Sequence, residues 1–286
     1  MDTALTLKKR LRSEQLSEAV IQDLLNRSEI VNQLLNQKVR IDTFTGLRKM
    51  EFRLIELSEI PHALELEKAQ ELLEQFITVV NVEDGFSLTG QTDGVLACHQ
   101  GIMTLIFIRS GRKDLADKGV EWILNYQITQ RGEKCTWTGK DLYSRFGGCV
   151  GRTPCYDGLI KNMTALSAYQ KTFGWRGDIQ EKLDLGLKYI LEHRGIYHLE
   201  NDELITDDIG KLFYPYPYRT NVLEVLILMK NEALLNRNEL KQARTYLGNK
   251  KAHAEKIFMP TSWTTFDPVN QHGEWISDVI EELKKN

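Results

Sequence analysis

The chain alternates between two kinds of helical segment. Two segments are apolar almost all the way round, at residues 94–109 and 220–229, and residues 154–173 are a further candidate for an inner helix. Each is followed by an amphipathic segment with apolar residues at three-to-four spacing on one face, at residues 114–127, 178–193 and 237–247. A helix that is apolar all round must be buried on most sides, whereas an amphipathic helix buries one stripe. The pattern therefore predicts inner helices that are each covered by an outer helix.

The alternation also predicts the fold class. No segment shows the strict alternation of apolar and polar residues that a half-buried strand requires, so we expect an all-α protein. The helix pairs recur about every 60 residues, as in folds where each pair buries its neighbour's apolar face. Such pairs can form an open solenoid or close into an α/α toroid. We predict one domain over residues 1–286, with an N-terminal helical part at 1–85 and a toroid part at 86–286 that ends in a helix at 275–283.

The N-terminal part is expected to be helical throughout. Ser13 is a suitable N-cap for a helix at 14–26, and apolar residues at three-to-four spacing after Ser28 predict a second helix over 30–35. Apolar spacing predicts a third helix near 47–55 and a longer one that begins near Pro61 and has an apolar face up to Val80. The basic run at residues 8–12 is typical of a solvated helix flank.

Composition excludes several classes of protein. A formal net charge of −3 provides no basic surplus for phosphate backbones, so we expect no nucleic-acid partner. No apolar stretch approaches the roughly 20 residues that span a bilayer, and the first residues do not resemble a secretion signal. We therefore expect a cytoplasmic protein without a transmembrane segment. Composition does not indicate the oligomeric state.

All four cysteines fall in one stretch of the chain, at Cys98, Cys135, Cys149 and Cys155. In a toroid the inner helices run parallel, so their N-termini share one rim, and the four sulfurs are expected to gather there. A helix N-terminus favours a thiolate, which would lower the thiol pKa and prepare the group to bind metal. Four thiolates suit structural zinc or, as a second choice, an iron–sulfur cluster, with His99 as a substitute ligand.

The spacing of the cysteines leaves another interpretation open. The chain contains no C-x-x-C pair, and free cysteines often pack as small buried hydrophobic residues. The hypotheses for this stretch are therefore a metal site, simple packing of reduced thiols, and a disulfide or reactive thiol.

Aromatic residues recur in the later loops that should reach the same rim. Tyr214, Tyr216, Tyr218, Arg219 and Trp263 are the candidate substrate-binding residues, since aromatic rings at the mouth of a toroid can line a pocket for an apolar small molecule. The alternative is a packed loop whose rings cover helix ends. Both interpretations place these side chains near the ends of the inner helices.

Two stretches carry a resemblance to a known family. The residues are Cys98-His99-Gln100-Gly101 followed by Val120-Glu121-Trp122-Ile123, and Phe213-Tyr214-Pro215-Tyr216-Pro217-Tyr218 before the apolar segment at 220–229. From about residue 90 onward the chain resembles the prenyltransferase and squalene-cyclase repeat family, in particular its small bacterial cyclase-like members. The resemblance implies an α/α toroid and an isoprenoid or other apolar substrate.

The chain departs from that family in its acidic motifs. It has neither the Asp-x-Asp-Asp motif that protonates an alkene nor the Asp-Asp-x-x-Asp motif that binds magnesium diphosphate, and Asp207-Asp208 is the nearest acidic pair. No catalytic residue is therefore assigned. Two functions are predicted as alternatives: a pocket that binds or converts an apolar substrate, and a non-catalytic binding or scaffold module with a metal or thiol site formed by the cysteines.

Overall fold

The computed structural model describes residues 1–137, 152–259 and 263–285. These residues are mostly helical, which confirms the all-α prediction. The departures from it in the described ranges are a short antiparallel hairpin of β1 (Asn81–Val82) and β2 (Gly85–Phe86) and a few isolated β-bridges in the loops. Sequence periodicity cannot reveal strands of two residues. In the same ranges, no helix combines the length and the hydropathy needed to cross a bilayer.

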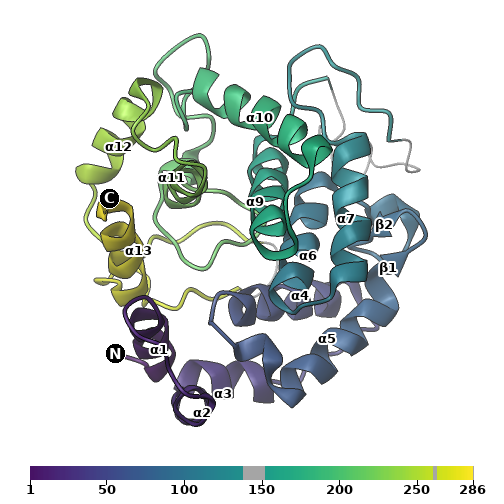
Figure 1. Cartoon of the computed structure of the whole chain (residues 1–286), viewed down its shortest axis with the longest axis vertical. Coiled ribbons are helices and arrows are strands. Elements are labelled where there is room, and N and C mark those ends of the chain that lie inside the picture. Colours follow the sequence, from purple (N-terminus) through teal and green to yellow (C-terminus); the bar gives the residue numbers. More distant parts are fainter. Residues whose placement is uncertain (138–151, 260–262, 286) are drawn as a thin grey trace.

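In the described ranges, four inner helices follow one another around the middle of the molecule (Figure 1). They are α4 (Phe44–Ser58), α6 (Ala97–Arg109), α9 (Tyr156–Phe173) and α11 (Val222–Asn231). Each packs against the amphipathic helix that comes next in the chain, and these are α5 (Glu67–Val80), α7 (Lys113–Tyr126), α10 (Gly177–Glu192) and α12 (Lys241–Gly248). Along the inner layer, α4 contacts α6, α6 contacts α9, and α9 contacts α11. The expected alternation of inner and outer helices is thus present, with one pair more than the three read from the sequence.

The two ends of the chain complete the arrangement. They contribute α1 (Thr3–Leu11), α2 (Glu18–Asn26), α3 (Glu29–Asn36) and α13 (Glu274–Lys284). Short 3-10 helices lie in the connections, at η1 (Ala63–Glu65), η2 (Thr92–Gly94), η3 (Asp207–Gly210) and η4 (Asn238–Leu240). Figure 1 places α1 beside α13, and an ion pair of 2.6 Å from Arg12 Nη1 to Asp278 Oδ1 links the two helices.

The start of the chain differs from the prediction. A helix runs from Thr3 to Leu11, and its N-cap is Asp2, whose carboxylate accepts a hydrogen bond from the backbone N–H of Ala4 at 2.8 Å. Ser13 therefore follows the end of a helix, and the next helix begins after Ser17. The carboxylate of Asp2 fixes the start of this helix, because the first four N–H groups of a helix need acceptors. The basic run then lies in the last turn of the helix.

Later N-terminal elements are closer to expectation. The second predicted helix is present as α3, and its N-cap is Ser28, whose hydroxyl accepts from the N–H of Val31 at 3.1 Å. The longer helix begins at Glu67, whereas Pro61 lies in the turn before η1. A proline fits the first turn of a helix but does not by itself fix where the helix starts.

Two residues of α6 set its close packing against its neighbours. A Cβ placed on Gly101 would lie 2.5 Å from the carbonyl carbon of Lys161, so the backbones of α6 and α9 approach closely only because position 101 is glycine. Gln100 is fully buried, and its side-chain oxygen accepts from the N–H of Phe86 at 2.9 Å. Its amide nitrogen donates to the carbonyl of Phe86, so this side chain holds β2 against α6.

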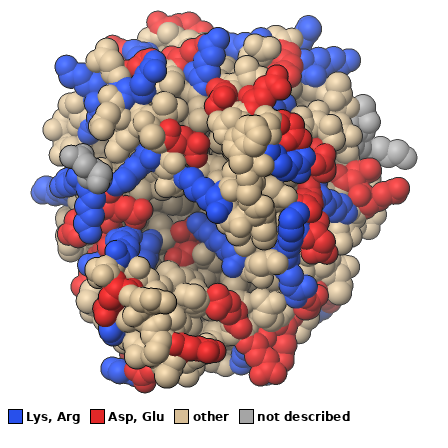
Figure 2. All heavy atoms as spheres, viewed as in Figure 1, with Lys and Arg blue, Asp and Glu red and all other residues tan. Residues whose placement is uncertain are grey.

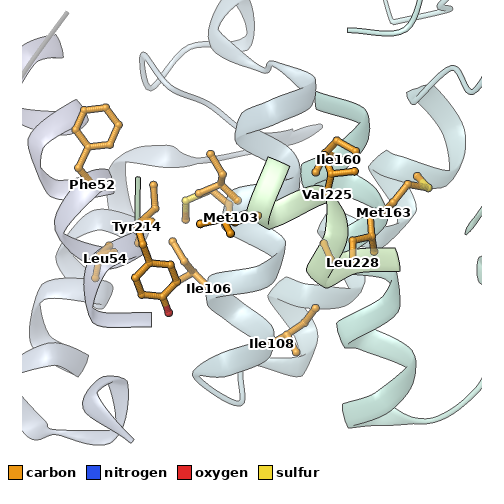
Figure 3. Close-up of a cluster of buried hydrophobic side chains, with 14 of the residues drawn as sticks. Phe52, Leu54, Met103, Ile106, Ile108, Ile160, Met163, Tyr214, Val225 and Leu228 are labelled. Carbon is orange, nitrogen blue, oxygen red and sulfur yellow. The ribbon is translucent and has the colours of Figure 1, made fainter. Parts of the chain in front are cut away.

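The apolar core is continuous across the inner layer. Figure 3 shows buried side chains from α4, α6, α9 and α11 in one cluster, among them Leu54, Met103, Met163 and Leu228. Tyr214, from the loop before α11, lies beside Ile106 in the same view. Burial of a side chain of this size contributes about 1.5–3 kcal/mol each, so this cluster contributes strongly to stability.

Candidate functional site: a central cavity with a polar end

The inner helices enclose a cavity of about 440 Å³. Its walls come from α4, α6, α9 and α11, from α1 and α13, and from the Tyr214 to Tyr216 segment. Figure 2 shows the corresponding face of the molecule hollowed near its middle, with basic and acidic side chains at the edge of the hollow. Sites for small molecules in proteins have volumes of roughly 300–1,000 Å³, so this cavity has an appropriate size.

Most of the wall is apolar. The lining side chains without polar atoms are Ile55, Ile60, Pro61, Leu64, Ile102, Leu105, Ile106, Ile227, Leu228 and Val279. They come from α4, the turn after it, α6, α11 and α13. Such a surface favours a ligand with an apolar body.

A chain of hydrogen bonds crosses one side of the cavity. Lys8 Nζ donates to the hydroxyl of Tyr214 at 2.7 Å, and this hydroxyl donates to Glu59 Oε2 at 2.8 Å. The other oxygen of Glu59 accepts from Arg109 Nη1 at 2.6 Å. Elements far apart in the sequence, α1, α4, α6 and the loop before α11, are thereby joined at one polar wall.

A second polar group comes from α9 and α11. Lys161 Nζ donates to both carboxylate oxygens of Glu224, at 2.6 and 2.7 Å. The hydroxyl of Thr220 also donates to this carboxylate. Lys161 and Glu224 are almost fully buried, so the pair satisfies two charges that could not remain inside the protein alone.

Two hydroxyl groups at the cavity lack partners. Tyr216 Oη and Thr164 Oγ1 both belong to residues that line the cavity, and neither has a hydrogen-bond partner in the described ranges. Leaving a buried hydroxyl unsatisfied costs about 1–3 kcal/mol. Both oxygens are themselves buried in the wall, so a molecule in the cavity would bond them after a small rotation of either side chain.

The acidic groups of the cavity have opposite pKa shifts. Burial acts to raise the pKa of Glu59, but the positive charges of Arg109 and Lys8 outweigh it, so the pKa lies below its ordinary value. Burial raises the pKa of Glu224 even though Lys161 opposes the effect. Burial also raises the pKa of Tyr216 well above 10, so its hydroxyl is neutral and can donate a hydrogen bond.

The five predicted substrate-binding residues separate into two groups. Tyr214 and Tyr216 line the cavity. Tyr218 and Arg219 lie outside its lining, where Arg219 Nη1 is 3.1 Å from Asp157 Oδ2 and its guanidinium stacks over the Tyr218 ring. Trp263 packs edge-on against Phe213 with ring centroids 5.8 Å apart, also outside the lining.

The cysteines gather in part. Cys98 lies close enough to Cys155 for the two to interact electrostatically, and Cys135 and Cys155 line the same small void between α7 and the start of α9. In the described parts of the chain, no group of three or more His, Cys, Asp or Glu residues is arranged to hold a metal ion. Cys149 falls outside the described residues, so the four-cysteine zinc or iron–sulfur site stays a prediction.

The expected activation of the thiols is wrong for Cys98. Burial raises the pKa of this thiol to about 12, and the nearby Cys155 and Asp157 raise it further. The α6 N-terminus was expected to lower the pKa, but desolvation of a thiolate outweighs a partial helix charge. Burial also raises the pKa of Cys135.

His99 has a role that the sequence left open. Its Nδ1 lies 2.7 Å from Glu51 Oε1, and the other oxygen of Glu51 accepts from Arg48. All three side chains are buried. The arrangement is that of a hydrogen-bonded core histidine held by a paired carboxylate.

Sequence analysis missed most of the charged wall of the cavity. Lys161 and Glu224 each place a charge on a segment predicted to be an inner helix, and this was the available signal, since an unpaired charge is not tolerated on a buried helix. Lys8 was assigned to a solvated flank, but its amine lies at the cavity and contacts Tyr214. No periodicity argument could place it, because the contact spans more than 200 residues.

Comparison with known proteins adds no relative: no family model, no curated protein and no solved structure matches this chain. The resemblance to the prenyltransferase and squalene-cyclase repeat family thus stays an expectation from sequence.

Proposed function

We propose that this chain is an α/α toroid that binds a small amphiphilic molecule, with an isoprenoid or similar apolar body, in the cavity at the centre of the ring. Support for the toroid comes from the four successive pairs of inner and outer helices, and from the contact of α11 with α13, which itself lies beside α1. A closed ring is expected to leave its ligand site on the axis, where the inner helices meet.

The proposed ligand class follows from the division of the cavity wall. Aliphatic side chains of α4, α6 and α11 favour an apolar chain, and the polar side near Tyr214 favours a hydroxyl, carbonyl or similar end group. A ligand that was apolar throughout would bury Lys8 and Glu59 against hydrocarbon, which is unfavourable for charged groups.

The single observation that carries the proposal is the pair of unpartnered hydroxyls at the cavity wall, Tyr216 Oη and Thr164 Oγ1. A protein that only needed to fill this space could place apolar side chains there at less cost. Hydroxyls that point to no protein partner are typical of groups that orient a ligand.

Two ligands that differ in one group test this proposal. Farnesol and farnesene share an isoprenoid body, but only farnesol carries a hydroxyl. We expect the wild-type protein to bind farnesol more tightly, by about three- to tenfold for one hydrogen bond. In Tyr216→Phe the ratio of the two dissociation constants should fall toward one. Tyr126→Phe removes a hydroxyl outside the cavity and should leave this ratio unchanged.

The outcomes are distinct. If neither ligand binds, the proposed function is wrong. If both bind but Tyr216→Phe keeps the full preference for farnesol, the cavity binds the apolar body and the assignment of Tyr216 to the polar end is wrong.

A further inference from the structure

Lys8 is placed unlike an ordinary surface lysine. It extends from α1 to the cavity, where its amine lies 2.7 Å from the Tyr214 hydroxyl. The amine is also 4.5 Å from the centre of the Tyr214 ring and 5.6 Å from the centre of the Trp275 ring. Aromatic faces and aliphatic side chains therefore surround much of this nitrogen.

The other lysine of the cavity provides the contrast. Lys161 Nζ donates to both oxygens of Glu224 and forms a buried ion pair with that carboxylate. Lys8 forms no ion pair with any carboxylate in the described ranges, and its hydrogen-bonding partner is a neutral hydroxyl. The same residue type thus serves two different purposes at one cavity.

The direction of the hydrogen bonds leaves Lys8 with spare capacity. Glu59 is ionised and can only accept, so the Tyr214 hydroxyl donates to it, and Lys8 must donate to the oxygen of Tyr214. One N–H of Lys8 is used in this way. The other N–H groups of Lys8 have no hydrogen-bond acceptor in the described part of the chain.

The charges around Lys8 are consistent with a reactive amine. Burial lowers the pKa of Lys8, and Arg12 lowers it further, while Glu59, Asp278 and Glu282 oppose the shift without cancelling it. A lysine whose pKa is lowered by an apolar pocket holds more of the neutral amine, which is the nucleophilic form.

We propose that Lys8 forms an imine with the carbonyl group of an amphiphilic aldehyde or ketone bound in the cavity. This inference rests on the proposed function, because the apolar wall must hold the carbon chain while the carbonyl carbon meets the amine. Tyr214 and Glu59 are the proton relay for the reaction.

The atoms balance without a further reactant. The Lys8 ammonium passes one proton to the Tyr214 oxygen as Tyr214 passes its own proton to Glu59, which leaves a neutral amine. The nitrogen lone pair then forms a bond to the carbonyl carbon, and the C=O π electrons move to oxygen, which takes a proton from nitrogen. The relayed proton then returns from Glu59 through Tyr214 to the hydroxyl oxygen, which leaves as water. The product is a C=N bond whose nitrogen keeps its one remaining proton.

Reductive trapping tests this assignment. Full-length protein is incubated with decanal and cyanoborohydride, which reduces the C=N bond and fixes one decyl group on the nitrogen, and peptide mass mapping locates the label. We expect Lys8 to be the first and main residue labelled, with Lys68, which is exposed, as the internal reference. In Lys8→Arg, which keeps the positive charge, and in Lys8→Met, which keeps the length, this label should be lost.

The two proposals can fail separately. Decan-1-ol has the same chain but cannot form an imine, so its binding, followed by native mass spectrometry, reports on the cavity alone. Binding of decan-1-ol without labelling of Lys8 overturns the imine and leaves the proposed function in place. Absence of decan-1-ol binding together with label spread evenly over surface lysines overturns both.

Discussion

Glu56 should make the stability of this protein depend on pH. The residue is on α4, and its side chain is 5% exposed. Its Oε1 accepts hydrogen bonds from the Thr264 hydroxyl at 2.7 Å and from the Thr264 N–H at 3.3 Å. Burial nevertheless raises the pKa of Glu56 to about 7, because the contacts with Thr264 and the charge of Arg53 offset only part of the desolvation.

The sign follows from proton binding. With its pKa raised, the folded state holds the Glu56 proton more tightly than the unfolded state does. Between the ordinary value of 4.5 and about 7, the folded protein therefore binds more protons, and stability falls as pH rises through this window. The difference between these values, at about 1.4 kcal/mol per pH unit, corresponds to about 3 kcal/mol.

The substitution Glu56→Gln removes this term, because glutamine stays neutral and its carbonyl can still accept from Thr264. Relative to wild type, the variant should gain up to about 3 kcal/mol of stability between about pH 4 and about pH 8. Urea unfolding followed by tryptophan fluorescence at several pH values in that range measures the difference. Glu71→Gln, on the exposed side of α5, is the matched control and should follow wild type at every pH. A stability difference between Glu56→Gln and wild type that is the same at all pH values would refute the reasoning.

Three further predictions follow from packing and charge. Gly101→Ala should lower the free energy of unfolding by about 1–3 kcal/mol, because the new methyl group meets the backbone of α9. Gly248→Ala is the control and should cost much less, since the space around Gly248 is open. Equal effects of the two substitutions in urea unfolding would contradict the close approach of α6 and α9. Glu51→Gln should lower the free energy of unfolding by about 3–5 kcal/mol in the same assay, since it leaves the buried Arg48 without its carboxylate. A decrease below about 1 kcal/mol would show that the ion pair of Arg48 and Glu51 is not desolvated. Asp278→Asn weakens the ion pair between α13 and α1, so the amide hydrogens of α1 should exchange faster than in wild type. The exchange of amide hydrogens in α9 should not change. Unchanged exchange in α1 would mean that contacts other than this ion pair hold α1 in place.

The layered fold could be predicted because burial leaves a direct trace in the sequence. The segments that become α6 and α11 are apolar on nearly every side, α9 is rich in apolar residues, and their partners α7, α10 and α12 are apolar on one side. The pair of α4 and α5 was not recognised, because α4 buries charged side chains such as Arg48, Glu51 and Glu56, which make it resemble a surface helix. Periodicity does not distinguish a charge that is paired inside from one that faces water.

The candidate site was predictable only where aromatic residues marked it. Tyr214 and Tyr216 were recognised because their segment is rich in aromatic residues. Their neighbours turn away from the cavity, since Arg219 contacts Asp157 and the ring of Tyr218 lies under Arg48. Which side of the loop faces the cavity depends on ion pairs with other helices, and sequence order does not contain that information. For the same reason the contribution of Lys8 became visible only in three dimensions.

The measurement that tests the central claim most directly is native mass spectrometry of the protein with farnesol, compared between wild type and two tryptophan variants. Leu105→Trp fills the cavity, whereas Leu185→Trp adds the same bulk on the exposed face of α10. A cavity that binds an amphiphile predicts one farnesol per chain in wild type and in Leu185→Trp, and loss of the complex in Leu105→Trp with the fold retained. Absence of a complex in wild type, or an unchanged complex in Leu105→Trp, would contradict the account.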